Sequence, residues 1–412
     1  MKVTRLTGSI KTKVNLPGSK SESNRVLIIE ALAESKVIPI ANLSEAKDTQ
    51  VLKCILNEDQ EQSIVNVGHA GTAMRFLTAY YASKRNVNIT LAGSKRMESR
   101  PIKLLVSALN KLGANIQYLK KEEYPPIQII GSQLQGGELE INSSVSSQYV
   151  SALLMIAPTL SNGLLLKLKG EVVSKPYIEM TLDLMSYFGI KVISQNNKYK
   201  ILPQPYVFKP ITIEADWSAA SYWFEVAALS NSCNIQLIGL NKSSRQGDQN
   251  VMSLFSKLGV TTKWVGNNLV LTKRSSFILD RNSSYHFYLE ETPDLAQTLI
   301  CTCAGLGLEA TFTGLSTLKI KETDRLKALK KELSKFGVEL LIKSSSEAYL
   351  SGMQLIKCPV NSIETYEDHR MAMSFAPLAL LVGELSISNP EVVKKSYPYF
   401  WDDLASVFDI EI

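Results

Sequence analysis

The sequence has few of the residues that would indicate disulfides, a metal site or a membrane anchor. Its 412 residues include five cysteines and three histidines. An odd number of cysteines without paired spacing argues against a disulfide framework, and Cys301 and Cys303 are too close for a zinc knuckle. The best apolar run, residues 371–382, is short and contains Pro377, and the N-terminus lacks the apolar core of a signal peptide. We therefore expect a cytoplasmic protein with reduced thiols, without metal, cofactor or membrane contact.

The net charge also lacks a strong bias. The chain carries 45 basic and 39 acidic residues, a formal charge of +6. This excess is too small and too dispersed to indicate nucleic acid. It also fits a pocket that concentrates cations around a small polyanionic substrate.

An internal repeat organises the chain. Gly113, Gly189, Gly259 and Gly337 each follow an apolar helical segment and stand 76, 70 and 78 residues apart. Each predicts a helix that ends on a glycine, followed by a strand. A strand over residues 2–14 precedes the first repeat, and its sequence alone leaves open which domain it joins.

Six strongly apolar helices recur with the same period. Their polar openings lie near Ser19, Gly68, Val145, Asp216, Asp294 and Asp368, and the helices are expected over residues 26–32, 73–81, 149–157, 219–229, 295–304 and 371–381. Helices this apolar are buried on most sides. Units of this length indicate two domains of three units each, divided near residues 210–215.

Several helix openings carry groups suited to anions. In the segment from Pro17 to Arg25, Ser19 or Ser21 is a candidate N-cap, and Lys20 lies beside free backbone N–H groups. A capped, solvated helix start explains this segment equally well. The same alternative holds for the openings at Arg75 and Lys321, and for Arg100, which precedes a proline at a predicted first helical position. The segment at His369 combines an acid, a histidine and an arginine.

Together these motifs resemble the EPSP synthase family (5-enolpyruvylshikimate-3-phosphate synthases, or 3-phosphoshikimate 1-carboxyvinyltransferases). The matching segments, in the family's order, are PGSKSESNR, AGTAMR, ESRPI, SSQY, SKPY, Pro293-Asp294, KETDRL, DHRMAM and the ending that starts at Lys395. They extend from residue 17 to residue 398, nearly the whole chain. Each motif is weak alone, but nine in order are highly specific.

The resemblance implies an α/β (α+β) fold. It is a two-domain inside-out α/β barrel with three βαβαββ repeats per domain around buried parallel helices. Residues 18–213 are expected to form the N-terminal domain, on the shikimate 3-phosphate side. Residues 1–17 and 214–412 are expected to form the C-terminal domain, so that the chain crosses between domains twice. We expect a monomer whose domains close over its substrates.

The implied reaction belongs to the shikimate pathway, which leads through chorismate to the aromatic amino acids. The enolpyruvyl group of phosphoenolpyruvate is transferred to the 5-hydroxyl of shikimate 3-phosphate through a tetrahedral addition–elimination intermediate, and phosphate is released. Such chemistry requires a base for the hydroxyl proton, an acid for the methylene carbon, and cations for the phosphates and carboxylates.

The resemblance also assigns site residues. Those expected at shikimate 3-phosphate are Lys20, Ser21, Arg25, Ser146, Ser147, Gln148, Ser174, Tyr177, Asp294 and Lys321. Those expected at phosphoenolpyruvate are Lys20, Gly71, Thr72, Arg75, Arg100, Gln148, Arg325, Arg370 and Lys395, with Lys394 as an alternative to Lys395. Asp294 is the implied proton acceptor and Glu322 the proton donor, assisted by Lys20. His369 is expected to hydrogen-bond near the transferred group.

The chain departs from the family pattern at three positions. His69 and Thr317 stand where the family usually has Asn, and Phe76 stands where it usually has Pro. The resemblance places His69 and Phe76 beside the phosphoenolpyruvate site, where glyphosate competes, and Thr317 weakens one substrate contact without removing a charge. Every charged motif position is retained, which argues against an inactive relative. A UDP-N-acetylglucosamine enolpyruvyl transferase would carry a cysteine in a Gly-rich loop, whereas Cys54 lies in an apolar stretch. An RNA-processing enzyme of related fold would require basic runs with aromatic platforms, and few are present.

Overall fold

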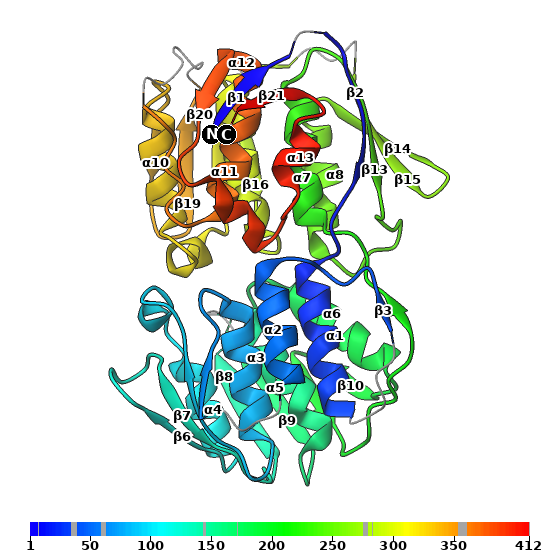
Figure 1. The fold of residues 1–412 in the computed structure, drawn as a ribbon, viewed down its shortest axis with the longest axis vertical. Helices are drawn as coiled ribbons and strands as arrows, with labels where there is room; N and C mark the ends of the chain where they lie inside the picture. Colours follow the sequence, from blue (N-terminus) through cyan, green and yellow to red (C-terminus); the bar gives the residue numbers. More distant parts are fainter. Residues whose placement is uncertain are drawn as a thin grey trace. The chain divides into compact units, whose positions relative to one another are not determined.

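The computed structural model describes residues 1–6, 8–33, 39–58, 63–142, 146–170, 172–274, 279–281, 283–352 and 361–411. Val145, the expected opening of the third buried helix, and Cys358 lie outside these residues. The chain divides into two compact units (Figure 1). Unit 1 comprises Met1–Gly18 and Glu214–Ile412, and unit 2 comprises Ser19–Ile213.

Four four-stranded sheets share one topology. Two neighbouring strands are parallel, and a hairpin then adds two antiparallel strands. Unit 2 contains β4(Ile64–Asn66)-β5(Asn88–Ala92)-β7(Ile127–Ile130)-β6(Asn115–Tyr118) and β8(Gly137–Asn142)-β9(Leu164–Lys169)-β11(Lys198–Ile201)-β10(Val192–Gln195). Unit 1 contains β2(Ile10–Asn15)-β13(Cys233–Ile238)-β15(Asn268–Lys273)-β14(Val260–Val265) and β16(Tyr285–Tyr288)-β17(Glu309–Thr313)-β19(Glu347–Ser351)-β18(Leu340–Ile342). The fold is therefore a mixed α/β arrangement of repeated small sheets.

The N-terminal segment forms two strands, where the sequence predicted one. β1 (Lys2–Arg5) lies between β20 (Glu384–Ser386) and β21 (Phe408–Glu411), whereas β2 pairs in parallel with β13. Gly8 separates the two strands with φ of 116°, a conformation that interrupts an extended chain. Both strands belong to unit 1. In unit 2, β3 (Ile40–Ala41) pairs in parallel with β12 (Ile211–Thr212).

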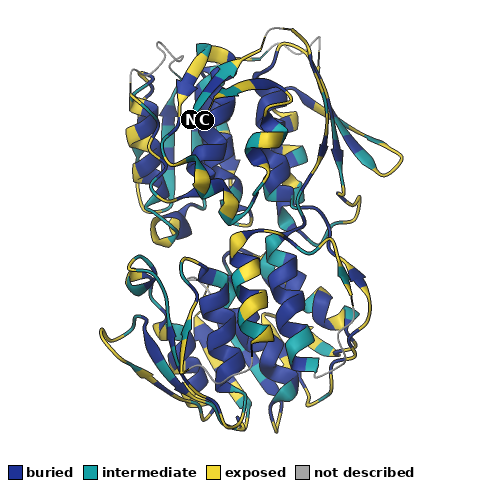
Figure 2. Ribbon diagram, viewed as in Figure 1, coloured by how far each residue is buried: buried dark blue, intermediate teal, exposed yellow. Residues whose placement is uncertain are grey.

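The six expected apolar helices are present and buried (Figure 2). They are α1 (Lys20–Ala33), α3 (Gly71–Ala82) and α5 (Ser147–Ile156) in unit 2, and α7 (Trp217–Leu229), α9 (Ala296–Leu306) and α11 (His369–Phe375) in unit 1. In each unit the middle helix of the three, α3 or α9, packs against the other two. The sixth helix is shorter than predicted because Pro377 lacks an N–H group, and the chain continues as η6 (Ala376–Leu378) and α12 (Ala379–Val382).

The four glycine-terminated helices also occur as predicted. They are α4 (Lys103–Lys111), α6 (Lys175–Tyr187), α8 (Val251–Ser256) and α10 (Arg325–Ser334), and each precedes a hairpin of one sheet. Gly113, Gly189, Gly259 and Gly337 have φ values of 99°, 90°, 84° and 81°, which favour glycine. The remaining helix of unit 2, α2 (Lys47–Asn57), packs against α1 and α3. Among the described residues, no helix combines the length and apolar character needed to cross a membrane.

Candidate active site

Arg325 is the centre of a buried ion-pair network in unit 1. It is the first residue of α10 and only 1% exposed. Its Nε lies 2.8 Å from Asp368 Oδ2, its Nη1 3.1 Å from Asp294 Oδ1, and its Nη2 2.9 Å from Glu322 Oε2. Burial alone would lower the pKa of Arg325, but the three carboxylates outweigh it and raise the pKa. The guanidinium therefore holds three acidic side chains from separate elements in one place.

Asp294 is surrounded by cations. It lies in η4 (Pro293–Leu295), and its Oδ1 is also 3.5 Å from Lys321 Nζ, while its Oδ2 is 2.9 Å from Arg370 Nη2. Burial by itself raises the pKa of the Asp294 carboxyl, but Arg370, Lys321 and Arg325 hold the pKa well below its usual range. Asp294 is therefore ionised at neutral pH in this arrangement.

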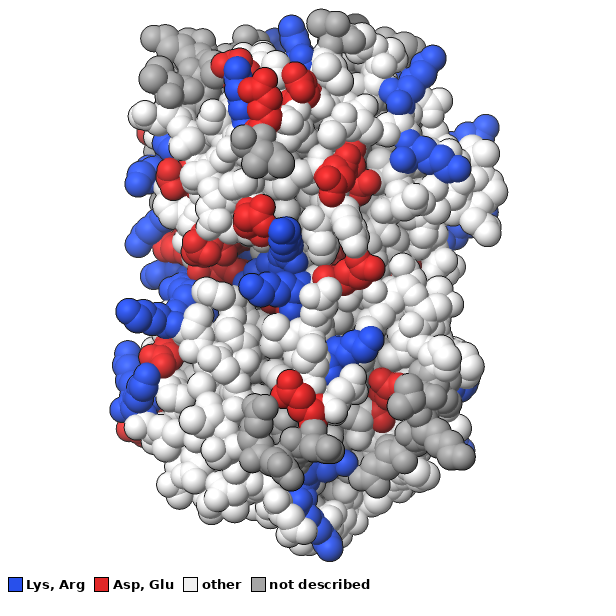
Figure 3. All heavy atoms as spheres, viewed as in Figure 1, with Lys and Arg blue, Asp and Glu red and all other residues white. Residues whose placement is uncertain are grey.

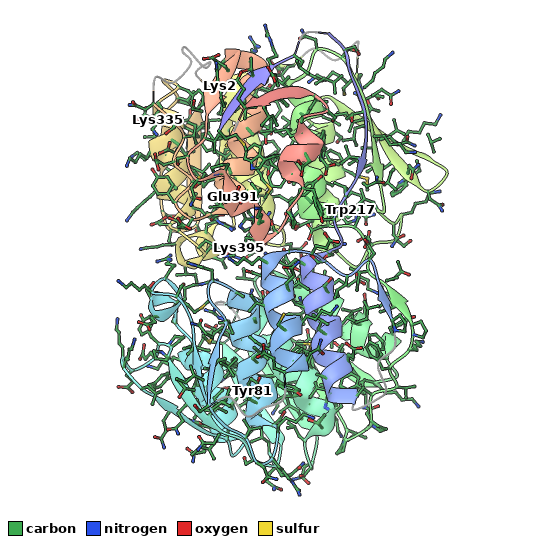
Figure 4. All side chains as sticks on the ribbon, viewed as in Figure 1. Lys2, Tyr81, Trp217, Lys335, Glu391 and Lys395 are labelled. Carbon is green, nitrogen blue, oxygen red and sulfur yellow. The ribbon has the colours of Figure 1, made fainter. Side chains whose placement is uncertain are left out.

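Glu322 contacts two cations on its two oxygens. Oε2 accepts from Arg325, and Oε1 lies 2.9 Å from Lys395 Nζ. Lys395, labelled in Figure 4, ends η7 (Pro390–Lys395) and is the lysine that reaches this network, whereas Lys394 pairs with Glu391 at the surface. The local geometry thus favours Lys395 over Lys394 as a site residue.

The start of α11, the sixth apolar helix, contributes Asp368, His369 and Arg370 to the network. Asp368 is the N-cap, and its Oδ1 accepts from the backbone N–H of Arg370 at 2.9 Å. The His369 ring is 1% exposed, with its Nδ1 3.7 Å from Asp368 Oδ1. The Arg370 guanidinium contacts Asp294, and its Nη1 donates to the Tyr222 hydroxyl at 3.3 Å.

The network carries a positive excess. Its cations are Lys321, Arg325, Arg370 and Lys395, four in number, and its carboxylates are Asp294, Glu322 and Asp368, three in number. One net positive charge in a largely buried setting favours an anionic ligand. Among the described residues, no group of three or more His, Cys, Asp or Glu side chains is arranged to hold a metal ion.

In unit 2, Arg25 joins the starts of several helices. Its Nε donates to Thr181 at 2.7 Å, and its Nη2 donates to Ser151 and to the Tyr177 carbonyl, both at 3.1 Å. Its Nη1 donates to the Ser21 carbonyl at 2.9 Å. Burial lowers the pKa of Arg25 to about 10, so the side chain stays charged at neutral pH. Arg25 thereby brings the predicted positions on α1 and α6 together.

A second group of predicted residues meets at the start of α3. Gln148 Nε2 on α5 donates to Thr72 Oγ1 at 3.1 Å. The Arg100 guanidinium lies against Gly71, where a Cβ atom would stand 2.5 Å from Arg100 Nη1. Arg100 is 7% exposed, and no described residue is a hydrogen-bond partner of its Nε. Arg75 is also buried, and it donates to the carbonyls of Gly71 and Pro101.

The remaining predicted positions of unit 2 lie at helix starts. Ser19 is the cap of α1, because its hydroxyl accepts from the Glu22 N–H at 3.4 Å. Lys20 Nζ lies 3.8 Å from Asp48 Oδ2. Ser146 caps α5 by accepting from the Gln148 N–H, with Ser147 as the first helical residue. Ser174 precedes α6 in a left-handed conformation.

Comparison with known proteins identifies the family that carries this arrangement. The model of the family described as EPSP synthase (3-phosphoshikimate 1-carboxyvinyltransferase) matches residues 4–404. The chain belongs to the EPSP synthase family.

Relatives and solved structures agree with this assignment. A 3-phosphoshikimate 1-carboxyvinyltransferase of Bacteroides fragilis is 47% identical over 398 residues, which is 96% of this chain and 95% of the relative. One of Sulfurovum sp. is 35% identical over 97% of both chains. A structure of EPSP synthase from Acinetobacter baumannii superposes with a TM-score of 0.76 at 19% identity, covering 100% of each chain, and shows a common fold.

The EPSP synthase motifs differ locally from what the sequence predicted in two places. The sequence predicts a helix opening at Lys321, but Lys321 follows η5 (Ser316–Ile320) and α10 begins only at Arg325. Pro101 was expected at the first position of a helix, but α4 begins at Lys103. Pro101 instead accepts hydrogen bonds from Arg75 and Tyr149 through its carbonyl. These two hydrogen bonds to the Pro101 carbonyl join segments that are separate in the sequence.

Four acidic or hydroxyl groups around the EPSP synthase motifs were not assigned from the sequence. The sequence indicates Asp368 only as part of its motif, and it carries no signal that marks Asp48, Asp248 or Ser218. Asp368 and Asp248 are buried helix-start carboxylates, and helix-start Asp is common as a simple cap. Only contacts in the folded chain distinguish these carboxylates from simple caps. Asp368 contacts Arg325, Asp48 lies near Lys20, and Asp248 accepts from Ser218.

The three departures from the EPSP synthase pattern have distinct surroundings. His69 Nδ1 lies 3.2 Å from Ser94 Oγ near the surface. The Phe76 ring is buried beneath the Arg25 guanidinium, with 5.5 Å between Arg25 Cζ and the ring centroid. Thr317 is buried, and its hydroxyl has no hydrogen-bond partner within the described part of the chain.

Proposed function

We propose that this chain transfers the enolpyruvyl group of phosphoenolpyruvate to the 5-hydroxyl of shikimate 3-phosphate, and that Asp294 and Glu322 are its acid–base pair. The observation that carries the proposal is the placement of these two carboxylates on the two terminal nitrogens of Arg325, Nη1 and Nη2, in a cationic, buried network. The activity is that of the family to which the chain belongs, 3-phosphoshikimate 1-carboxyvinyltransferase.

The proposed ligand sets follow the family motifs. Shikimate 3-phosphate is bound by Lys20, Ser21, Arg25, Ser146, Ser147, Gln148, Ser174, Tyr177, Asp294 and Lys321. Phosphoenolpyruvate is bound by Lys20, Gly71, Thr72, Arg75, Arg100, Gln148, Arg325, Arg370 and Lys395. Burial of the two arginines beside Gly71 and of Arg325 and Arg370 supports this assignment, because weakly hydrated guanidinium groups suit phosphate and carboxylate ligands.

Substrate anions would change the basicity of Asp294. With three cations beside it, the carboxylate has too low a pKa to be an effective proton acceptor. Anions that bind to Lys321, Arg325 and Arg370 offset these positive charges, and the pKa of Asp294 then rises towards the range of a working base. The base is thus activated only when both substrates are present.

Glu322 is proposed to protonate the methylene carbon of phosphoenolpyruvate, assisted by Lys20. The same offset acts on it, because its neighbours Arg325 and Lys395 are both proposed phosphoenolpyruvate ligands. Once a bound anion offsets their positive charge, these cations favour the ionised carboxylate less, which makes the protonated carboxyl that an acid catalyst requires more accessible. His369 would hydrogen-bond near the transferred group.

The proposal also includes the finer architecture. Residues 18–213 and residues 1–17 with 214–412 would be the two domains of an inside-out barrel with three βαβαββ repeats each. The first repeat would be a reduced copy that includes α1, β3 and α2, and the sixth a reduced copy that includes α11, β20 and β21. A monomeric, cytoplasmic enzyme is supported by the separate hydrophobic core of each unit and by the four described free cysteines.

A nucleic-acid function has less support. On the face shown in Figure 3, basic side chains are interspersed with acidic ones, a mixture that does not favour a phosphate backbone. Cys54 lies on helix α2, whereas a UDP-N-acetylglucosamine enolpyruvyl transferase would carry its cysteine in a Gly-rich loop.

The test is an assay of phosphate release from shikimate 3-phosphate and phosphoenolpyruvate. We expect turnover by the wild type, and we expect Asp294→Ala and Glu322→Gln to lower kcat by about 100-fold or more with KM changed by less than about threefold. Asp324→Asn is the matched control, since Asp324 caps α10 within the same motif and Asn is as good a cap, so the change should affect stability by less than about 1 kcal/mol without affecting turnover. Absence of wild-type turnover would refute the proposed function, and a loss confined to KM would refute the two roles.

A further inference from the structure

A carboxyl and a hydroxyl outside the family motifs contact the Arg370 side of the network. Ser218 lies in the first turn of α7, and Asp248 lies in η3 (Gly247–Asn250). The Ser218 hydroxyl donates to Asp248 Oδ2 and accepts from Arg370 Nη2 at 3.4 Å. The same Arg370 nitrogen lies 2.9 Å from Asp294 Oδ2. Arg370 is therefore held between the candidate base and the Ser218–Asp248 pair.

The backbone around this pair is itself fixed. The Gln246 side chain accepts from the Trp217 N–H at 3.1 Å and donates to the Ala215 carbonyl at 2.8 Å. These bonds join the loop before η3 to the start of α7, directly beside Asp248 and Ser218. The hydroxyl and the carboxyl thus have little freedom to move away from Arg370.

Asp248 is in an unusual setting for an ionised carboxylate. It is 5% exposed, and its Oδ1 has no hydrogen-bond partner among the residues that the structure describes. Burial, and then the negative charge of Asp294, raise the pKa of Asp248 to about 7 against the opposing effects of Ser218 and Arg370. The negative charge of Asp216, the N-cap of α7, raises the pKa of Asp248 further. Helix α8, which packs against η3, contains no titratable side chain.

We propose that Ser218 and Asp248 are positioning residues that orient Arg370 towards its anionic ligand, and that Asp248 must be neutral for this ligand to bind tightly. The inference rests on the proposed function, in which Arg370 binds phosphoenolpyruvate. A neutral Asp248, protonated on Oδ1, still accepts from the Ser218 hydroxyl on Oδ2 and leaves the charge of Arg370 for Asp294 and the substrate. An ionised Asp248 adds a like charge close to the bound anion, which weakens binding.

The proposal predicts that phosphoenolpyruvate binding is coupled to the protonation of Asp248. If binding favours neutral Asp248, the affinity for phosphoenolpyruvate decreases as the pH rises through the range in which Asp248 ionises. A one-unit change in the pKa of Asp248 on binding corresponds to about a tenfold change in affinity. An amide at position 248 cannot ionise, so Asp248→Asn should not show this decrease.

The experiment measures KM for both substrates between pH 6 and pH 8.5 in the wild type, Asp248→Asn and Ser218→Ala. We expect the ratio of wild-type to Asp248→Asn KM for phosphoenolpyruvate to rise about tenfold across this range. The ratio cancels the ionisation of the substrate itself. The same ratio for shikimate 3-phosphate should change by less than about twofold, because Arg370 is not among its proposed ligands.

Ser218→Ala gives a second, independent test. It should raise KM for phosphoenolpyruvate about three- to tenfold at pH 6 with kcat within about twofold, because one contact of Arg370 is lost. Parallel pH profiles for wild type and Asp248→Asn, or an unchanged KM in Ser218→Ala, would overturn the inference while wild-type turnover leaves the proposed function intact. Failure of the wild type to turn over would instead refute the proposed function.

Discussion

Replacement of Arg325 by Met should destabilise unit 1 strongly. Met has a similar length but no charge, so the change leaves Asp294, Glu322 and Asp368 without the guanidinium that they share. Two of these carboxylates keep another cation, since Asp294 retains Lys321 and Arg370 and Glu322 retains Lys395. The largest penalty therefore comes from Asp368, the third carboxylate.

Asp368 determines the magnitude of the loss in the free energy of unfolding. It is 0% exposed, and after the substitution it keeps the backbone N–H of Arg370 and the 3.7 Å approach of the His369 ring. Removal of one partner from a buried ion pair typically costs about 3–5 kcal/mol, because the other charge stays buried and uncompensated. We expect a loss in this range at pH 8, and not three times as much.

The loss should also depend on pH. In the wild type the lowered pKa of Asp294 contributes stability that is present above the usual carboxyl range and is lost as the pH falls. Without Arg325 this contribution is smaller. The difference between wild type and Arg325→Met should therefore be largest near neutral and alkaline pH and should shrink as the pH falls to about 4 and below.

The assay is urea unfolding at several pH values, with Lys327→Met as the matched control. Lys327 is on the same helix, and its side chain is 74% exposed beside Asp324, so its removal should cost less than about 1 kcal/mol. A loss in Arg325→Met no greater than in the control, or one that grows as the pH falls, would refute the reasoning.

Three further predictions concern single side chains. Lys395→Met should lower kcat/KM for phosphoenolpyruvate at least about tenfold, whereas Lys394→Met should leave it within about twofold; equal effects in steady-state kinetics would contradict the assignment. Gly71→Ala should raise the same KM about tenfold or more, because the added Cβ displaces the Arg100 guanidinium, and an unchanged KM would argue against that contact. Burial raises the pKa of Glu225 well above its usual value, so its stabilising contribution is lost as the pH rises from about 4.5 through the folded-state pKa. Glu225→Gln removes this dependence, and the stability of the variant relative to the wild type should increase with pH in thermal unfolding; a constant difference would show that Glu225 does not bind a proton on folding.

Local patterns in the sequence predicted the repeated elements well. The six apolar helices and the four helix-ending glycines depend on hydrophobicity and backbone freedom along short segments, and both are confirmed. The order of the motifs led to the EPSP synthase family, which the comparisons confirm. Four local details were wrong. Lys321 lies before α10, α4 begins after Pro101, the sixth apolar helix ends at Phe375, and the N-terminal strand is divided at Gly8.

The partners of the charged side chains were less predictable. The sequence placed Arg325 beside Glu322 and Lys321, its neighbours along the chain. Its contact with Asp368, 43 residues away, depends on how α10 and α11 pack. The contacts of Ser218 with Asp248 and Arg370 were not predictable for the same reason, because a buried carboxylate and a solvated cap have the same local sequence signal.

The sequence by itself therefore determined the type and order of the elements, the family and the residues that carry its motifs. Hydrophobic periodicity, glycine and proline act within a few residues, so their effect can be read along the chain. Only the tertiary structure decided which cation meets which carboxylate and which carboxyl is buried. Charge interactions and desolvation depend on distance and burial, and both are set by packing between segments that the sequence separates.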